Sequence, residues 1–250
     1  MTPPLFLVEE LGEPADGAEL TLTGDEAHHG ASVLRLKPGE AVLVGDGAGA
    51  VAEGTVAAVR PGRDAVVTVI VRRRWVEPEP ALRFTVVQAL AKGDRGELAV
   101  EQAAQVGADA VIPWRAARCV ARWDEGPRGA KALAKWRSVA RAATKQARRP
   151  RLLHVAEPVT TRELLGLASS AALTVVLEGD AERAFADLPW PERGEVLLVV
   201  GPEGGITPEE RAALASAGAV EARLGPYVLR TSTAGAVAVS AAATLTKRWR

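Results

Sequence analysis

The spacing of the apolar runs changes in kind at the proline-rich segment WVEPEPALR, residues 75–83. Before this segment, short runs rich in valine and leucine follow one another with turn signals between them, which is typical of β-strands. After it, strand-like runs alternate with helical segments, which favours a parallel sheet covered by helices on both faces. We therefore predict an α/β protein with two domains, residues 1–75 and 81–250, separated by a stiff linker.

Each region has its own expected elements. In the first, we expect strands at 5–8, 19–22, 41–46, 51–59 and 65–74, and one short helix opened by the capping box Thr23-Gly24-Asp25-Glu26. In the second, the expected strands are 82–90, 109–113, 173–178, 195–200 and 219–224. The expected helices are 94–106, 130–148, 161–168, 181–187 and 208–217, with a last one from Thr231. Cys119 is expected to be a buried thiol in a further strand.

Charge is unevenly distributed although the formal net charge is zero. Lysine and arginine crowd the segment 115–151, where only Asp124 and Glu125 oppose them, and Arg72-Arg73-Arg74 forms a second cluster. This pattern fits either a solvated helix face or a surface for an anionic partner, with RNA the first candidate. Trp114, Trp123 and Trp136 lie in the basic segment and are candidates for the core or for stacking on bases.

The expected cellular setting is cytoplasmic. A single cysteine excludes a disulfide within the chain and favours a reducing compartment. The N-terminus lacks the basic and long apolar regions of a signal peptide, and residues 231–246 are too short and hydroxyl-rich for a good membrane span. No metal site is expected, because the adjacent His28 and His29 would point in different directions on a helix.

Three late strands end in unusual loops, at 177–180, 201–205 and 224–231. The carboxyl ends of neighbouring parallel strands share one edge of a sheet, where ligands bind. The helix at 208–217 already has a capping box, Thr207 to Glu210, so the glycines of Gly-Pro-Glu-Gly-Gly are not expected to serve the turn. We expect them to admit a ligand to the backbone. Glu203 disfavours a phosphate and favours a cationic or hydroxyl-bearing ligand such as S-adenosylmethionine.

Two of these motifs carry a resemblance to a known family. GPEGGITPEE, followed one strand later by LGPYVLRTSTA, resembles the closing motifs of the RsmE family, small-subunit (16S) ribosomal RNA uridine-N3 methyltransferases of the SPOUT superfamily. The resemblance extends over essentially the whole chain, with further matching segments at residues 28–49, 89–109 and 135–150. It implies a PUA-like β-barrel followed by an α/β domain with a C-terminal trefoil knot, acting as a homodimer. The implied partner is small-subunit ribosomal RNA, free or in the assembled subunit.

The resemblance also implies site residues. S-adenosylmethionine would be held by Leu177, Gly179, Gly201, Glu203, Gly204, Gly205, Leu224, Leu229, Arg230 and Thr231. Arg230 would also be catalytic, because a fixed cation stabilises the negative charge that develops on the uracil oxygens. The RNA-binding candidates are Arg35, Arg72, Arg73, Arg74, Arg118, Arg148 and Arg149. A helix from Thr231 rich in glycine, alanine and serine is a candidate subunit interface, or is buried in its own domain.

The chain departs from the family pattern at a few positions. Ser232 replaces a usual glutamate, Glu101-Gln102 replaces Gln-Lys, and Ala117 replaces an acidic residue. Alternative functions are another SPOUT reaction, such as ribose 2′-O methylation, or a PUA-like RNA-binding protein with a vestigial pocket. The retained glycine loop argues against the vestigial pocket, because a dead site has no need of bare backbone.

Overall fold

A computed structural model describes residues 2–124 and 126–249, which divide into two compact units. Residues 1–79 and 144–152 make up the first unit, and residues 80–143 and 153–250 make up the second. The segment 144–152 therefore packs with the N-terminal unit although it lies far along the chain. Part of it is held by backbone hydrogen bonds, from Gly49 to Pro150 and from Leu152 to Gly47.

The first unit is a five-stranded sheet in the order β1-β3-β4-β5-β2, in which only the β1–β3 pair is parallel. Valine alternates along β5, so that Val67, Val69 and Val71 face the core. The strands lie close to their predicted positions. They are β1 (Leu5–Leu7), β2 (Glu19–Leu22), β3 (Ala41–Gly45), β4 (Ala50–Arg60) and β5 (Val66–Val76).

The short helix of this unit differs from the prediction at its start. Helix α1 (Gly24–His28) is capped without a side-chain hydrogen bond from Thr23, and it continues as a π-helical turn, His29–Val33. Glu26 instead forms a half-buried ion pair with Lys145, 2.7 Å long, and Lys145 also lies over the ring of Phe6. The carboxylate is thus used for packing and not for the predicted capping box.

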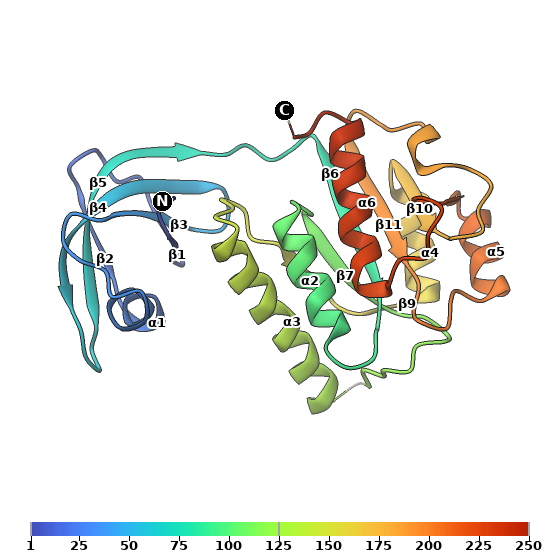
Figure 1. Ribbon diagram of the computed structural model, residues 1–250, viewed down its shortest axis with the longest axis horizontal. Coiled ribbons are helices and arrows are strands. Elements are labelled where there is room, and N and C mark those ends of the chain that lie inside the picture. The colour runs from blue at the N-terminus through green and yellow to red at the C-terminus, as the bar shows by residue number, and fades with distance from the viewer. Residues whose placement is uncertain (1, 125, 250) are drawn as a thin grey trace. The chain divides into compact units, whose positions relative to one another are not determined.

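The second unit contains a wholly parallel sheet, as the alternation of strands and helices predicts. Its strand order is β12-β10-β11-β6-β7-β8, with β9 also pairing with β7. Strands β6, β7, β9, β10 and β11 are labelled in Figure 1. The strands are β6 (Leu82–Ala89), β7 (Ala110–Arg115), β8 (His154–Val155), β9 (Val159–Thr160), β10 (Leu173–Leu177), β11 (Gly194–Val200) and β12 (Val220–Ala222).

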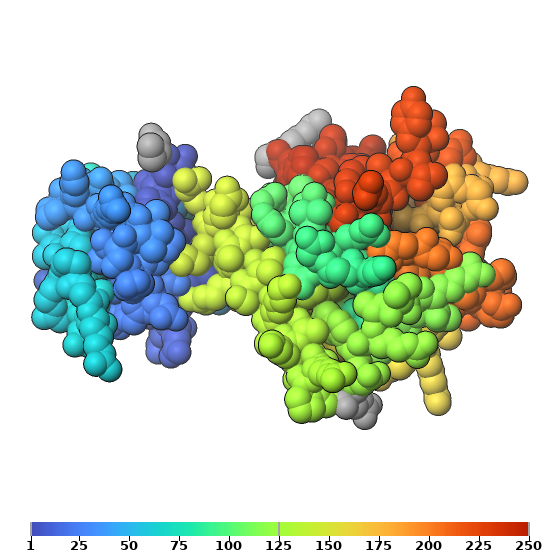
Figure 2. Space-filling view, turned by 60° about the horizontal axis from the view of Figure 1, so that its bottom comes forward, coloured from blue at the N-terminus to red at the C-terminus, as the bar shows by residue number. Residues whose placement is uncertain are grey.

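Helices cover both faces of this sheet. The helices α2 (Arg95–Gln105), α3 (Pro127–Gln146) and α6 (Thr231–Leu245) contribute to one buried cluster, and α4 (Thr161–Ser170) and α5 (Pro208–Ser216) contribute to the other. Helix α3 turns Leu133, Trp136 and Ala140 inward, while its lysines and arginines are mostly exposed, and the helix is visible in yellow-green in Figure 2.

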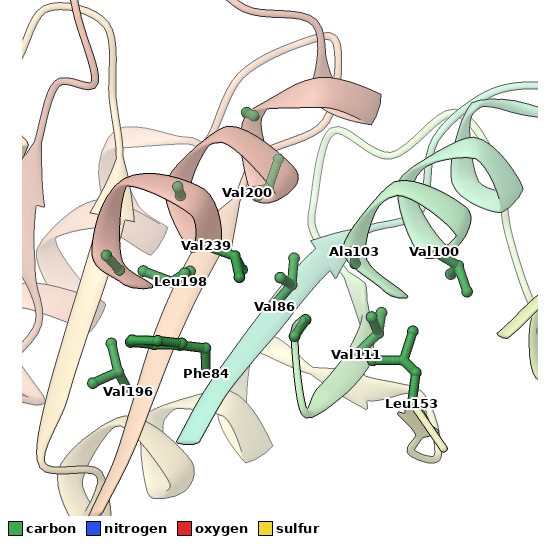
Figure 3. Close-up of a cluster of buried hydrophobic side chains, with 14 of the residues drawn as sticks. Phe84, Val86, Val100, Ala103, Val111, Leu153, Val196, Leu198, Val200 and Val239 are labelled. Carbon is green, nitrogen blue, oxygen red and sulfur yellow. The ribbon is translucent and has the colours of Figure 1, made fainter. Parts of the chain in front are cut away.

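The larger cluster fixes the central strands on which the later loops depend. Phe84, Val86, Val196 and Leu198 project from β6 and β11 toward Val239 of α6 (Figure 3). The small residues of α6 allow this close approach, because a Cβ added to Gly235 would come within 2.8 Å of Val86. Gly235, Ala236, Ala238, Ala242 and Ala243 are buried within the unit. Much of the small-residue stripe therefore packs against its own domain.

Two predicted elements are wrong. The helix expected at 181–187 is only a 3-10 turn, η2 (Phe185–Asp187). The Arg223 side chain donates to the carbonyls of Ala181 and Glu182, and Ala184 pairs with Arg223 in an isolated parallel bridge, so tertiary contacts hold the segment extended. Cys119 lies in no strand, because the chain turns after β7 with a hydrogen bond from the Cys119 backbone to Ala116.

Candidate functional site

The three late loops line one pocket at the carboxyl edge of the parallel sheet. The pocket has a volume of about 400 Å³ and lies beyond β10, β11 and β12. Its wall includes every residue of the predicted cofactor set except Gly204. These residues are Leu177, Gly179, Gly201, Glu203, Gly205, Leu224, Leu229, Arg230 and Thr231.

Each glycine of the 201–205 loop occupies a position where a side chain is disfavoured, for a different structural reason in each case. Gly205 has a φ of +74°, a conformation that disfavours a side chain. A Cβ at Gly201 would lie 2.7 Å from Cγ1 of Ile206, and one at Gly204 would lie 3.2 Å from Cβ of Arg118. The expectation that the turn does not itself need these glycines is therefore wrong. Gly204 faces Arg118 and not the pocket.

The helix that follows begins as the sequence predicts. The Thr207 side chain accepts from the backbone of Glu210, and the Glu210 side chain accepts from the backbone of Thr207. The same Glu210 carboxylate also accepts from the Ala117 backbone at 2.9 Å and from the Thr161 hydroxyl at 2.8 Å. This buried carboxylate therefore ties the start of α5 to the segment after β7 and to α4.

Glu203 is paired within the protein. Its carboxylate accepts from Nη1 of Arg95 at 2.9 Å and from the backbone N–H of Lys92 at 3.2 Å. Burial by itself raises the pKa of Glu203, but hydrogen bonds from its own backbone, Arg95 and Lys92 outweigh it and leave the pKa below its ordinary value. Glu203 is thus an ionised anchor that joins the glycine loop to the start of α2.

Thr231 joins the last loop to the centre of the sheet. Its hydroxyl donates to the carbonyl of Gly201 at 2.7 Å and accepts from Nε2 of Gln88 at 3.1 Å. Gln88 is fully buried, and its Oε1 has no hydrogen-bond partner among the described residues. Its polar side chain at the end of the apolar run FTVVQAL was a usable sequence signal. Arg95, which also lines the pocket, gave no such signal, because only the fold brings it to Glu203.

Arg230 lies at the mouth of this pocket as the residue before α6. Within residues 2–124 and 126–249, no carboxylate lies within ion-pairing distance of its guanidinium. The neighbouring Tyr227 and Val228 are 84% and 94% exposed. This part of the chain, coloured orange-red, protrudes from the surface in Figure 2.

The RNA-binding candidates differ in what they contact. Arg35 and Arg72 are exposed, and no partner of either side chain is found among the described residues. Arg73 pairs with Glu53 and stacks on Trp75, and Arg74 donates to the carbonyl of Gly12. The remaining candidates are more enclosed or occupied: Arg118 donates to Gly204, Arg148 donates to the carbonyls of Thr2 and Pro3, and Arg149 is half-buried.

Two further candidate reactive residues, Cys119 and His29, are partly buried and have shifted pKa values. Burial raises the pKa of the Cys119 thiol, and the charges of Glu210 and Glu203 add to this effect. Burial, and then the charge of Lys145, lower the pKa of His29, which packs edge-on to Phe6. The described residues contain no cluster of side chains that could hold a metal ion. No helix among them is long and apolar enough to cross a membrane.

Family models match both units. A model of the RNA methyltransferase domain matches residues 77–243, and a model of the RNA methyltransferase PUA domain matches residues 22–70. The chain is 46% identical over 249 residues to ribosomal RNA small subunit methyltransferase E of Mycobacterium bovis, covering 98% of this chain and 93% of that protein.

Two solved structures resemble the whole chain. One is a methyltransferase of Legionella pneumophila in complex with the cofactor SAM, with a TM-score of 0.84, 26% identity and 98% coverage of both chains. The other is ribosomal RNA small subunit methyltransferase E of Neisseria gonorrhoeae bound to S-adenosyl methionine, with a TM-score of 0.83, 25% identity and 98% coverage of both chains.

Proposed function

This chain belongs to the ribosomal RNA small subunit methyltransferase E family, and from that premise we propose that it methylates uridine N3 in small-subunit (16S) ribosomal RNA with S-adenosylmethionine (SAM) as donor. The observation that carries the proposal is the convergence of three loops on one pocket of about 400 Å³. That volume lies within the range usual for sites of small molecules. The reaction takes place in the cytoplasm, where ribosomes are made.

The pocket suits SAM by its chemistry. Leu177, Leu224 and Leu229 offer apolar surface for an adenine ring, and the glycines on two loops leave backbone groups open to hydrogen bonds. When bound, SAM supplies an electrophilic methyl group. Because the carboxylate of Glu203 is paired with Arg95, it positions the glycine loop and is only partly free to face a positive ligand.

Arg230 is the proposed catalytic residue. Loss of the N3 proton spreads negative charge over the two uracil oxygens, and the forked guanidinium matches such a target. Its charge is not neutralised by any carboxylate of the described residues, and the N-terminus of α6 beside it adds a favourable dipole. Both effects stabilise the transition state more than the neutral ground state. Arginine is a poor proton acceptor, so Arg230 is assigned charge stabilisation and not the role of the general base.

Cys119 bears on which uracil atom accepts the methyl group. Methylation at carbon 5 uses a thiolate that attacks the ring, and a thiolate is favoured by positive surroundings. The pKa of Cys119 is instead raised, first by burial and further by Glu210 and Glu203. The thiol stays protonated at neutral pH, which supports N3 over carbon 5.

The finer features of the fold are part of the same proposal. Residues 1–75 act as the PUA-like RNA-binding domain and residues 81–250 as a SPOUT methyltransferase domain with a C-terminal trefoil knot. The return of α6 onto the central strands β6 and β11, after the chain has passed through β12 at the sheet edge, supports such a topology. We also propose an oligomeric state. The protein acts as a homodimer, in which a second copy covers the exposed Tyr227 and Val228. A monomeric mass by light scattering at micromolar concentration would exclude the dimer.

Mapping the methyl group tests the activity. Purified protein is incubated with labelled SAM and either free small-subunit ribosomal RNA or intact subunits, and the digested RNA is analysed by mass spectrometry. We expect 3-methyluridine. A label on a ribose would indicate 2′-O methylation, and no label on either substrate would refute the proposed function.

A further inference from the structure

A second pocket lies beside the one already described, and nothing in the proposed mechanism uses it. Its volume is about 370 Å³. It is formed by Leu90 just after β6, Arg115 at the end of β7, and most of the segment that follows β7, namely Ala116, Ala117, Cys119, Ala121, Arg122, Trp123 and Asp124. This is large enough for a nucleotide, since sites for small molecules start at about 300 Å³. The side chains that give it chemical character are Arg115, Cys119, Arg122, Trp123 and Asp124.

The two pockets are neighbours. Arg118 lies between residues that line the second pocket, and its Nη1 donates to the carbonyl of Gly204 at 3.0 Å. Gly204 in turn lies between residues that line the first pocket. The charge of Glu203 also reaches Cys119, whose pKa it helps to raise after burial and Glu210. A molecule in the second pocket would therefore lie next to one in the first.

The two arginines of the second pocket have no ion-pair partner among the described residues, and one of them carries a buried, unpaired donor. Nε of Arg115 is buried and has no hydrogen-bond partner among the described residues. Arg115 contributes to the lowered pKa of Glu163, after the hydrogen bonds from Thr160, but the two form no ion pair. Arg122 is exposed and has no partner in the described part of the chain. A buried donor without a partner costs stability, and an anionic acceptor would remove that cost.

Trp123 adds an aromatic side chain to the lining of the second pocket. Its ring packs edge-on to Trp136, with the ring centroids 4.8 Å apart at an angle of 76°. Trp136 is buried, so this contact helps to fix the position of Trp123. Aromatic rings that border a basic groove stack on unpaired bases.

We propose that the second pocket holds the target nucleotide of the RNA, with its base beside Trp123 and its phosphate at Arg115 and Arg122. Asp124 on the same wall accepts a hydrogen bond from the ribose or the base, and it disfavours a small, doubly charged anion such as inorganic phosphate. This inference rests on the proposed function, because it makes the second pocket the acceptor side of the methyl transfer.

The test compares single charge changes in the full-length protein. Arg115→Gln and Arg122→Gln remove the pocket cations, and Arg128→Gln is the matched control. Arg128 is an exposed residue in the first turn of α3 and lines neither pocket. KM for small-subunit RNA should rise about tenfold in each pocket variant, the size of one lost charge-assisted hydrogen bond. The control should change KM by less than about twofold, and SAM affinity should be equal in all variants.

The outcomes separate this inference from the function on which it rests. If the wild type methylates the RNA but the pocket variants match Arg128→Gln, the pocket assignment is wrong and the function stands. If the wild type leaves the RNA unmethylated, the function fails, and calorimetry with uridine 5′-monophosphate in the presence of SAM still tests the pocket. We expect uridine 5′-monophosphate to bind more tightly than inorganic phosphate and to lose this affinity in Arg115→Gln. Equal affinity for inorganic phosphate would overturn the nucleotide assignment.

Discussion

The two pockets lie at the same edge of one sheet but treat their polar groups in opposite ways. In the first, Glu203 is held by Arg95 and a backbone N–H, and Thr231 bridges Gly201 and Gln88. In the second, Arg115 and Arg122 find no partner among the described residues. The first pocket is organised before any ligand arrives, while the second leaves its charges for a ligand to satisfy.

This difference suits the two proposed ligands. A small cofactor binds more tightly when the loops of its site are already fixed, because less conformational entropy is lost on binding. The hydrogen bonds that hold Glu203 and Thr231 fix the loops in this way. An RNA nucleotide brings its own negative charge, so free arginines supply attraction that paired arginines would lack. Arg230 is the exception in the first pocket, because its guanidinium has no carboxylate partner in the described chain. A free cation on the wall of the cofactor pocket can stabilise negative charge that develops on a base brought there.

The largest effect is expected from Arg230, the free charge in the otherwise paired pocket. Arg230→Ala should raise the barrier of single-turnover methyl transfer by about 2–4 kcal/mol, the scale of one lost oxyanion donor. SAM affinity should change little, and the rate should rise with pH toward the ionisation of uridine. Arg193→Ala is the control, because Arg193 is an exposed arginine just before the amino-terminal end of β11. A variant that loses SAM binding but keeps its rate at saturating SAM would place Arg230 in the cofactor site alone.

The next effect comes from filling the first pocket. Gly205→Val adds a side chain to its wall, and overpacking on this scale should lower SAM affinity by about a hundredfold in calorimetry. The variant also strains the backbone, because Gly205 has a φ of +74°. Gly218→Val controls for that strain, since Gly218 has a φ of +92° and open space around it, outside the pocket. Equal SAM affinity in both variants would show that Gly205 does not border the cofactor.

Much of the fold could be predicted because the signals are local. Alternating and continuous valine runs indicated the strands, and the capping box at Thr207 located the start of α5. The segment 181–187 could not be predicted, because its good helix formers are overridden by Arg223, which lies about forty residues away and bonds its carbonyls. The packing of residues 144–152 with the first unit could not be predicted either, because it depends on contacts with residues far away in the sequence, such as Gly47 and Gly49.

The part of the first pocket that is formed by the loops after the strands could be predicted from the sequence. Glycine-rich strand ends, read with the family resemblance, gave most of the first pocket's wall. The Arg95–Glu203 pair was missed because the two residues are 108 positions apart, and the direction of Gly204 depends on Arg118 across the sheet edge. The second pocket had no motif at all, since its free arginines resemble the solvated arginines around them.

The contrast between paired and free cations extends to the first unit and predicts a smaller effect. Arg35 and Arg72 are without partners in the described chain, whereas Arg148 donates to the carbonyls of Thr2 and Pro3. Replacing Arg35 and Arg72 together by Ala should flatten the slope of log K against log salt for RNA binding by nearly two units, at about 0.9 per phosphate by analogy with B-DNA. Arg148→Ala should instead lower the melting temperature by about 2–4 °C, for a loss of about 1 kcal/mol. A flattened slope in Arg148→Ala alone would reverse this assignment.

The smallest effect concerns the anchor of the glycine loop. The folded-state pKa of Glu203 lies below its ordinary value, so its stabilising contribution is complete above the unfolded pKa near 4.5 and is lost as the pH falls through the lower folded pKa. At pH 7, Glu203→Gln should weaken SAM binding by about two- to fivefold, because a partly exposed ion pair contributes up to about 1 kcal/mol. The difference from the wild type should shrink as the pH falls below 4.5. Glu209→Gln is the matched control, since Glu209 also has a lowered pKa, from hydrogen bonds with its own backbone and Thr207, but lines neither pocket. A loss well above tenfold at pH 7 would mean that Glu203 contacts the positive charges of SAM directly, and the first pocket would then share the second pocket's reliance on charge.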